Sequence, residues 1–541
     1  MGTSWHAFLT GAFEPGARVA IDKPPVDLWL QVASTRVFGF TTTALILPAA
    51  IAGTLTVLAL YDLGRVLFGP RAGLAAAAAF AVLPIAVITA RSDTMDSVMA
   101  ALVTVAAALT ARAARSGRIW LLVAAGAVLG LAFEVKLFEA LVAAPALVAL
   151  WWWAADGTRR RRVGGLVGAG AAFTVLALAW LCAVSLVPAG SRPYALGSTN
   201  GSAWNAVFVY DGIDRLGAGP GAGAGRAGAD PPTRAEAAAA PAPPGAFRLL
   251  SPHASLQSRI GLAIAAAVVA LAAGLAFGGR ARLSGMGRAG LAALAVWLAC
   301  GAVLASAMHG LHPRYLESFT PAVAACLGAG AALVARGRAR VPVSVAFAVL
   351  LTAGLLVSAR AVSAHVTDSG RPGFISPARV AALSAFLRAH DAGTTDEVAS
   401  VAPSKAAQLV ARDGRPVLVL ASVDGRPLVT PRALAADVAA GRVRFALLGD
   451  RCVRPGTAAC TQAARWVRAH GVDVSAAAGQ PRPGLVYRLG PRARGRTPRL
   501  VRVRTSSRSP AAARRARPRS SAPPRRGPRG AHRARSARVR A

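Results

Sequence analysis

Ten apolar segments that contain no Asp, Glu, Lys or Arg constrain this chain more than any other feature. They cover residues 41–60, 73–90, 97–111, 119–133, 140–155, 163–188, 261–279, 289–308, 318–335 and 341–359. Most approach the ~20 residues that a helix needs to cross a bilayer. Because lipid offers the backbone no hydrogen-bond partners, such segments must be helical. The sequence therefore predicts a polytopic α-helical membrane protein with about ten transmembrane helices.

The formal net charge of +39 would suit a nucleic-acid-binding protein, but its distribution argues against that class. Residues 491–541 hold 18 Arg and no acid, and much of the remaining positive charge lies in short loops between the apolar segments. Charge in such loops sets the orientation of a membrane protein. We therefore expect membrane lipid, and no nucleic acid, as a partner.

Lys and Arg alternate strongly between successive loops. One set of loops holds fifteen of them, namely Arg65, Arg71, Arg112, Arg115, Arg118, Arg159, Arg160, Arg161, Arg162, Arg280, Arg282, Arg288, Arg336, Arg338 and Arg340. The short loops of the other set hold only Arg91, Lys136 and Arg314. The positive-inside rule assigns the first set to the cytoplasm. We expect a multi-pass plasma-membrane protein whose residues 1–40, long loop 189–260 and C-terminal domain lie outside.

Charged and polar side chains collect on this predicted outer face. They are Asp22, Lys23, Arg91, Asp93, Asp96, Glu134, Lys136, Glu139, His312, Arg314, Tyr315 and Glu317. Any one of them could be an interfacial anchor, but together they bring acids and bases to one side of the membrane. Such a mixture suits a site that binds an anion and transfers protons beside it.

The soluble parts of the chain differ in composition. Residues 216–247 are rich in Gly, Ala and Pro, which predicts a flexible insert within the outer loop 189–260. The Arg-rich tail 490–541 should be disordered. It is either an adhesive segment for anionic lipid or wall polymer, or the product of a reading-frame error.

Residues 374–489 predict an extracytoplasmic α/β domain that follows the transmembrane domain 41–360. Strands are expected at 398–401, 416–420, 443–448 and 485–489, and helices at 377–390, 431–440 and 462–470. This alternation favours a mainly parallel sheet. No phosphate-binding loop or nucleophile motif is present, so a binding or accessory role is expected. Cys452 and Cys460, eight residues apart around a Pro-Gly turn, favour a disulfide in an oxidising compartment.

Several motifs resemble those of glycosyltransferase family 39, a group of GT-C-fold membrane enzymes that includes protein O-mannosyltransferases and the aminoarabinose transferase of lipid A. The segment I-D-K-P-P-V-D-L-W-L-Q (21–31) resembles the family's D/E-K-P-P motif, and A-R-S-D-T-M-D-S (90–97) matches its second acidic position at Asp96. The segments G-S-T-N-G-S-A-W (197–204) and H-P-R-Y-L-E-S-F-T-P (312–321) resemble an actinobacterial subgroup assigned as mannosyltransferases. Members of that subgroup carry a similar C-terminal exported α/β domain.

The resemblance implies transfer of a monosaccharide, with mannose favoured, from a polyprenyl-phosphate carrier to a protein or glycan acceptor. Lys23 matches the family's phosphate-contacting Lys, and Lys136 and Arg314 are further candidates by charge and placement. The candidate catalytic acids are Asp96, Asp93 and Asp22. Further candidate site residues are His312, Tyr315 and Glu134. No metal or cofactor is expected.

Family members carry a first transmembrane helix and a principal catalytic acid before the K-P-P motif. This sequence starts at Met1, already inside the corresponding loop, so that helix and acid are expected upstream of Met1. Met1 is then expected to be an internal Met taken as the start. Two other functions stay open. One is a transporter or flippase for lipid-linked or polar solutes, although no charged mid-membrane helix indicates it. The other is a catalytically dead envelope scaffold.

Overall fold

The computed structural model describes most of the chain up to Gly490. The described residues are 4–12, 17–214, 244–250, 266–269, 283–308, 311–335, 340–364, 377–390, 393–422, 425–448, 452 and 458–490. The Arg-rich tail beyond residue 490 and residues 215–243, which hold almost all of the predicted insert, lie outside these ranges. Met1 also lies outside them. The expectation of a helix and a principal acid upstream of Met1 therefore stays a prediction.

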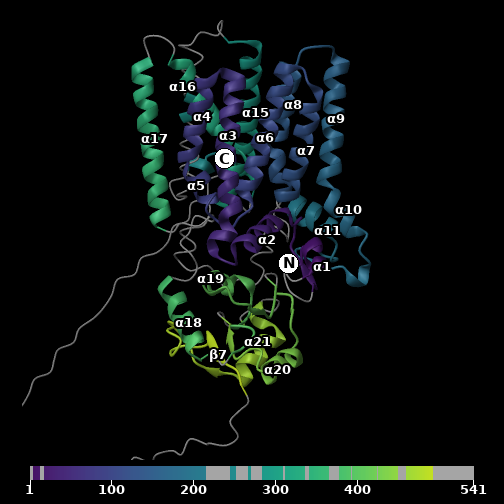
Figure 1. Ribbon diagram of the computed structural model, residues 1–541, viewed down its shortest axis with the longest axis vertical. Coiled ribbons are helices and arrows are strands. Elements are labelled where there is room, and N and C mark those ends of the chain that lie inside the picture. The colour runs from purple at the N-terminus through teal and green to yellow at the C-terminus, as the bar shows by residue number, and fades with distance from the viewer. Residues whose placement is uncertain are drawn as a thin grey trace, which may run out of the picture. The chain divides into compact units, whose positions relative to one another are not determined.

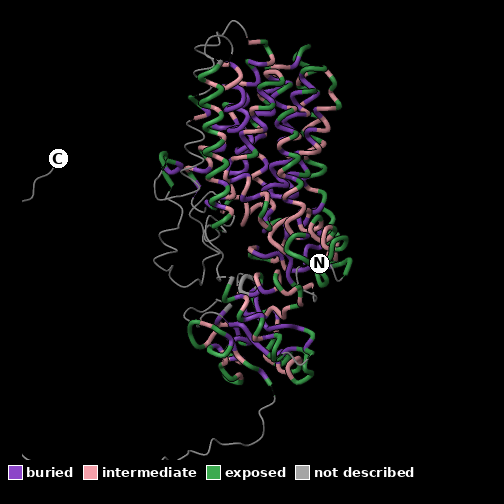
Figure 2. Tube along the Cα trace, turned by 60° about the vertical axis from the view of Figure 1, so that its left-hand side comes forward, coloured by how far each residue is buried: buried purple, intermediate pink, exposed green. Residues whose placement is uncertain are grey.

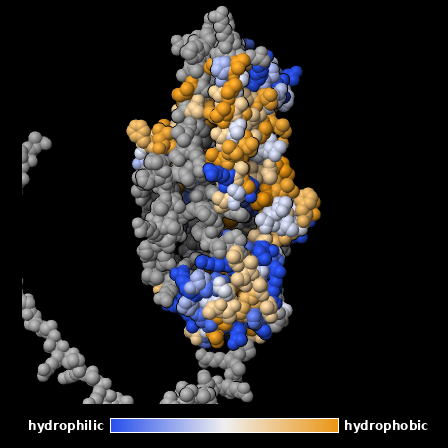
Figure 3. All heavy atoms as spheres, turned by 90° about the vertical axis from the view of Figure 1, so that its left-hand side faces the viewer, coloured by the Kyte–Doolittle hydropathy of each residue, from blue (hydrophilic) through white to orange (hydrophobic). Residues whose placement is uncertain are grey.

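A bundle of apolar helices forms the first part of the fold (Figure 1). Its helices are α3 (Thr42–Phe68), α4 (Pro70–Val82), α5 (Pro84–Thr89), α6 (Asp96–Ser116), α7 (Ile119–Lys136), α8 (Ala144–Ala154), α9 (Arg159–Ala177), α10 (Ala179–Ser185), α15 (Gly285–Ala307), α16 (Thr320–Val334) and α17 (Arg340–Ser363). Buried residues lie inside this bundle and exposed ones on its outer surface (Figure 2). On the face drawn in Figure 3, the coloured surface of the helical part is largely hydrophobic, as expected of helices that face lipid.

Fewer described helices are long enough to cross a membrane than the ten that the sequence predicts. Within the described residues, five helices are long and apolar enough to cross a membrane, or six if the bent pair α9–α10 is one span. Proline shortens others, since Pro84 separates α4 from α5 and Pro321 lies in the first turn of the short α16. Nine of the ten predicted segments coincide with described helices. Most of the remaining segment, 261–279, is outside the described residues.

Close helix contacts depend on glycine. A Cβ atom on Gly126 of α7 would collide with the carbonyl group of Ala169 in α9. A Cβ on Gly328 of α16 would likewise meet the backbone of Ala76 in α4. Helix association in lipid relies on such close packing, because lipid tails are as apolar as the helices and the hydrophobic effect does not drive the helices together.

The connection between α7 and α8 reverses the chain. Leu137 has a φ of 49°, a left-handed value that a non-glycine residue adopts rarely, and it ends α7. A 3₁₀ segment, η1 (Leu137–Ala143), leads into α8. Both α7 and α8 pack against α6. The last residue of α7, Lys136, pairs with the first residue of α6, Asp96, so the end of α7 lies beside the start of α6.

Short elements cover this end of the bundle. They are α1 (Trp5–Thr10), β1 (Val19–Ala20), α2 (Val26–Phe38), β2 (Tyr194–Ala195), α11 (Ala203–Asn205), the π-helical η3 (Ala206–Ile213), η5 (Arg248–Leu250) and the 3₁₀ segment η7 (Pro313–Ser318). Strands β1 and β2 pair in parallel, so segments far apart in the sequence are joined. The indole Nε1 of Trp29 in α2 donates to the Phe8 carbonyl of α1 at 2.7 Å.

The second part of the fold contains a five-stranded sheet in the order β4-β3-β5-β7-β6. Its elements are α18 (Pro377–His390), β3 (Ala399–Ser400), α19 (Pro403–Asp413), β4 (Leu418–Val419), α20 (Pro431–Ala439), β5 (Phe445–Leu447), η8 (Ala458–Cys460), α21 (Gln462–His470), β6 (Val472–Asp473) and β7 (Val486–Arg488). The structure contains the Cys452–Cys460 disulfide, with the two Cα atoms 4.6 Å apart.

The expectation of a mainly parallel sheet is wrong for half of the strand pairs. Strand β3 is parallel to β4 and β5, whereas β7 is antiparallel to β5 and β6. No helix lies between β6 and β7, and a parallel pair would need a longer crossover. Helix α19 was not among the predicted elements.

Candidate functional site

The polar cluster around Asp96 forms where the start of α6 lies beside the end of the antiparallel helix α7. Asp96 is the first residue of α6 and Lys136 the last of α7. A carboxylate at a helix N-terminus and an ammonium at a C-terminus both interact favourably with the helix dipole. The segment η7, which begins with Pro313, adds Arg314 to the same place. Three elements distant in sequence therefore supply one charged centre.

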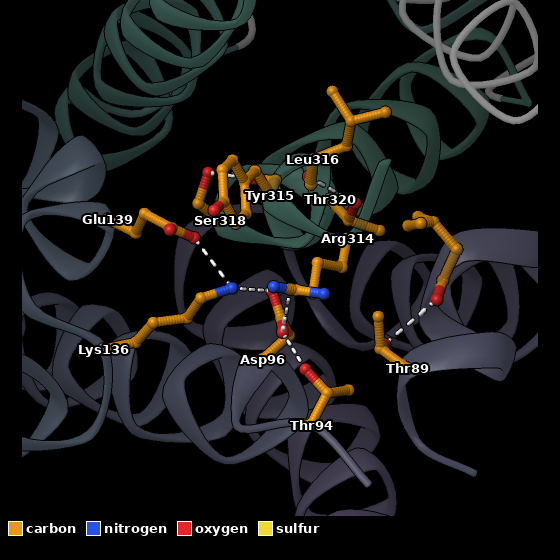
Figure 4. Close-up of polar contacts among 11 residues, drawn as sticks. Thr89, Thr94, Asp96, Lys136, Glu139, Arg314, Tyr315, Leu316, Ser318 and Thr320 are labelled. Carbon is orange, nitrogen blue, oxygen red and sulfur yellow. Dashed lines mark hydrogen bonds and ion pairs between the residues drawn. The ribbon is translucent and has the colours of Figure 1, made fainter. Parts of the chain in front are cut away.

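Asp96 is the hub of this cluster, which we call the Asp96 cluster: Thr94, Asp96, Lys136, Glu139 and Arg314 (Figure 4). The Asp96 side chain is 0% exposed and pairs through Oδ1 with the Lys136 Nζ. Its Oδ2 accepts a hydrogen bond from the Thr94 hydroxyl and lies 3.8 Å from the Arg314 Nε. A buried carboxylate is stable only with partners of this kind.

Lys136 bridges two carboxylates and an aromatic ring. Its Nζ lies 2.9 Å from Oε2 of Glu139, and its side chain is only 5% exposed. The same ammonium lies 4.7 Å from the centroid of the Tyr315 ring. Tyr315 also packs edge-on against His312, with 5.2 Å between ring centroids. The structure thus brings Asp96, Lys136, Arg314, His312 and Tyr315 together, all of which were candidates from sequence.

Lys23 belongs to a second group of charges. Its Nζ lies 2.7 Å from Oδ1 of Asp22 and 3.4 Å from Oδ2 of Asp211, which belongs to η3. The rings of Phe138 in η1 and Phe208 in η3 meet edge-on at 5.8 Å, so η3 lies beside the segment that carries Glu139. The Lys23 group is therefore a neighbour of the Asp96 cluster through η1 and η3.

Asp27 was not among the sequence candidates. It lies in the first turn of α2, directly after the K-P-P motif, and is 2% exposed. Burial, with smaller contributions from the negative charges of Asp93 and Asp96, raises the pKa of Asp27 to about 7. The Gln31 side-chain amide donates to Asp27 Oδ2 at 2.8 Å, which opposes that rise. Asp27 is therefore electrostatically coupled to the Asp96 cluster.

Glu134 has a different environment from the other candidates. Its Oε1 accepts a hydrogen bond at 3.1 Å from the backbone N–H of Trp180, in the first turn of α10. It thus satisfies a donor at the bend between α9 and α10. Asp93 is exposed and acts on Asp27 through its charge. The structure therefore places Glu134 in a supporting position and Asp93 beside the buried carboxylates.

Sequence reasoning could have found some of the overlooked residues. Thr94 stands two positions before Asp96, within hydrogen-bonding reach of a residue that starts a helix. Glu139, which the sequence placed on the outer face without a role, follows Lys136 by three positions, a spacing at which side chains meet on a helical turn. Asp211 carried no such signal, because its partner Lys23 is 188 positions away.

Within the described part of the chain, no group of three or more His, Cys, Asp or Glu side chains is placed to hold a metal ion. The described site offers cations and carboxylates. Two cations can bind an anionic group, and adjacent carboxylates can accept a proton.

The fold of this helix bundle is similar to those of two solved membrane enzymes. The structure resembles ArnT of Cupriavidus metallidurans, solved bound to undecaprenyl phosphate, with a TM-score of 0.53 and 17% identity over 81% of this chain and 85% of ArnT. It also resembles the oligosaccharyltransferase of Archaeoglobus fulgidus in its apo form, with a TM-score of 0.50 and 13% identity over 82% of this chain and 65% of that one.

Sequence comparison supports the same assignment. Residues 22–183 match the family described as "Dolichyl-phosphate-mannose-protein mannosyltransferase", and residues 383–470 match "Putative mannosyltransferase YkcB-like, C-terminal". The Bacillus subtilis proteins "Putative mannosyltransferase YycA" and "Putative mannosyltransferase YkcB" are each 34% identical, over 216 and 227 residues. These matches cover 40% and 41% of this chain, and 32% of each relative's length.

The match over residues 22–183 includes the D-K-P-P segment, whose resemblance to glycosyltransferase family 39 the sequence indicated. The family match includes Lys23, Asp96 and Lys136, whereas Arg314 lies outside it.

Proposed function

We propose that this protein transfers a monosaccharide, mannose in the favoured case, from a polyprenyl-phosphate carrier to an acceptor on the outer face of the membrane. The Asp96 cluster carries the proposal. A buried carboxylate, a buried ammonium and a guanidinium from three elements meet at the end of an apolar bundle. The names of the Bacillus relatives support mannose, and the lipid in the ArnT structure supports a polyprenyl-phosphate carrier.

The cations of the cluster are suited to the carrier phosphate. Arg314 can present two N–H groups to phosphate oxygens, and Lys136 acts as a compact point charge. When the bond between the anomeric carbon and the phosphate oxygen breaks, the polyprenyl phosphate keeps the electron pair. Fixed cations stabilise the negative charge that develops on it. Lys23, beside Asp22 and Asp211, is a further candidate for contact with the phosphate.

The acceptor hydroxyl needs a base to take its proton as it attacks the anomeric carbon. Asp96 is our first candidate, although both of its oxygens have cationic partners. A phosphate that binds Lys136 and Arg314 would compete with Asp96 for them and so release a carboxylate oxygen. Asp22 and Asp93, which also lie near this end of the bundle, are the other candidates.

Transfer of radiolabelled mannose from polyprenyl-phosphate mannose, in membranes that contain the chain, tests this function. We expect Asp96→Asn and Lys136→Met to lower the transfer rate by about 100-fold or more, because each removes a charge from the reacting centre. Arg71→Gln is the matched control, since Arg71 is an exposed cation at the opposite end of α3 and α4. It should transfer at the rate of the unsubstituted chain.

Binding of the carrier gives a second readout that distinguishes the roles of the residues. Thermal stabilisation by undecaprenyl phosphate should be lost in Lys136→Met and kept in Asp96→Asn. Absence of transfer, both from this chain and from a form extended upstream of Met1, with correct insertion and retained lipid binding, would overturn the transferase and favour a scaffold. Transfer that survives both substitutions would overturn the assignment of the site.

A further inference from the structure

A basic cavity lies at the end of the bundle opposite the Asp96 cluster. It has a volume of about 300 Å³ and is formed by the last turns of α3 and α6 and the first turn of α7. Four arginines line it together with three other side chains: Arg65, Arg112, Arg115, Arg118, Val66, Ser116 and Leu121. We call it the arginine cavity. Nothing in the site described above uses these residues.

Part of the cavity wall is held in place by one carboxylate. Arg112 donates from Nε to Oδ2 of Asp62 at 2.6 Å and from Nη2 to Oδ1 at 2.8 Å. Arg65 donates to the same Oδ1 at 2.8 Å. A paired, bidentate guanidinium is pre-organised, so less conformational entropy is lost when a ligand binds beside it.

The charge balance of the cavity is positive. Asp62 offsets one of the four arginines, and the C-terminal dipoles of α3 and α6 offset about half a charge each. The N-terminus of α7 adds about half a positive charge. A surplus of about two and a half positive charges therefore remains for an anion. Arg115 and Arg118 are both exposed.

The surroundings place this anion in the headgroup layer of the membrane. Trp120, which is 63% exposed, follows Arg118 by two positions, and Trp153 at the end of α8 is 55% exposed. Exposed tryptophans of membrane helices mark the interface between hydrocarbon and water. The apolar Val66 and Leu121 line the cavity beside its cations. They offer an apolar contact for the glycerol and upper acyl carbons of a lipid.

We propose that the arginine cavity binds the phosphate group of an anionic phospholipid from the leaflet opposite the Asp96 cluster. Arginine forks match phosphate oxygens in pairs, and basic pockets between helices bind lipid headgroups in this way. Arg115 and Arg118 contact the phosphate, while Asp62 positions Arg65 and Arg112. The lipid fastens the ends of three helices, two of which carry the catalytic candidates at their other ends.

Orientation by positive charge alone is the competing explanation for these arginines. It depends on charge and not on geometry, because Lys and Arg serve it equally. Phosphate binding in a fork does depend on geometry, since Lys lacks the planar pair of donors. Arg115→Lys/Arg118→Lys therefore separates the two explanations, and Arg115→Gln/Arg118→Gln removes both effects.

The experiment measures lipid retained by the purified full chain, using native mass spectrometry with titrated phosphatidylglycerol and phosphatidylcholine. We expect one tightly held phosphatidylglycerol, with affinity reduced about tenfold or more in the Gln double variant and about threefold or more in the Lys double variant. Arg159→Gln/Arg160→Gln is the matched control. It removes the same charge from exposed residues that do not line the cavity, and its affinity should not change.

Three results would overturn the proposal. Equal losses in the control and the cavity variants would show diffuse attraction to the membrane surface. Unchanged affinity in the Lys double variant would show that these arginines act through their charge alone. Displacement of the lipid by glycerol phosphate at equal concentration would show a site for a free phosphate instead. Cysteine labelling of each variant checks that its orientation is retained.

Discussion

At the scale of single residues, the Asp96 cluster combines strong pairing with deep burial. Asp96 and Lys136 are 0% and 5% exposed, whereas Asp437 and Arg442, paired in the second part of the fold, are 19% and 55% exposed. A buried charge that loses its partner costs far more than an exposed one, because water cannot solvate it. The charges that we assign to function are therefore also structural.

Lys136→Met tests this coupling. Removing the ammonium leaves Asp96 and Glu139 facing each other's charge, so we expect a loss of about 3–5 kcal/mol in unfolding free energy. Asp96→Asn/Lys136→Met should recover more than half of that loss. The measurement is thermal unfolding in detergent, with Arg442→Met as an exposed-charge control. A Lys136→Met loss no larger than that of the control would contradict the buried pairing.

The raised pKa of Asp27 predicts a pH dependence of stability. With a folded pKa of about 7 and an unfolded pKa of about 4, the folded chain holds a proton that the unfolded chain releases between those values. Stability from this group is therefore present at low pH and is lost as pH rises from about 4 to 7. Asp27→Asn should raise the melting temperature at about pH 8 and leave it unchanged at about pH 5. The same shift at both pH values would show that burial of the charge is not responsible.

At the scale of elements, the sequence predicted most helices of the bundle and several of the site residues at their ends. Charge-free apolar segments identified most bundle helices, because lipid allows no other backbone structure. The site residues at helix ends were found for the same reason: Asp96 and Lys136 lie just beyond the apolar segments of their helices. Asp27 and Asp211 were missed, since only tertiary structure brings β1, α2 and η3 beside those helix ends. The antiparallel β6–β7 pair was missed because strands of two or three residues carry little pattern.

Gly126→Val tests the close packing of α7 on α9. The added side chain collides with the Ala169 carbonyl, and overpacking of this kind costs about 1–3 kcal/mol or more. Gly170→Val in α9 is the matched control, because a Cβ atom there meets nothing within 4 Å. We expect a lower melting temperature for the first variant only. Equal effects would point to glycine's backbone freedom instead of helix contact.

At the scale of the whole molecule, the distribution of Lys and Arg predicts which end of the bundle faces outward. The Asp96 cluster and the arginine cavity lie at opposite ends of α6, so one orientation determines the environment of both. Our proposals require the Asp96 cluster outside and the arginine cavity inside. They fail together if the orientation is reversed.

Cysteine labelling tests this orientation. In a chain with Cys182→Ser, which removes an exposed thiol, Thr199→Cys should react with an impermeant maleimide in intact cells. Ser116→Cys should react only after lysis. Thr199 and Ser116 are both exposed, so accessibility within the fold does not separate them. The opposite pattern of labelling would contradict the predicted topology.

The pairing of Asp96 with Lys136 also bears on how the chain enters the membrane during synthesis. At about 5–20 residues per second, Arg314 is made on the order of ten to forty seconds after Asp96, but Lys136 follows within about two to eight seconds. Helices α6 and α7 form a hairpin whose two free ends carry opposite charges. Asp96 can therefore enter the bilayer already paired with Lys136, so the translocation step meets an ion pair at this position instead of a lone carboxylate.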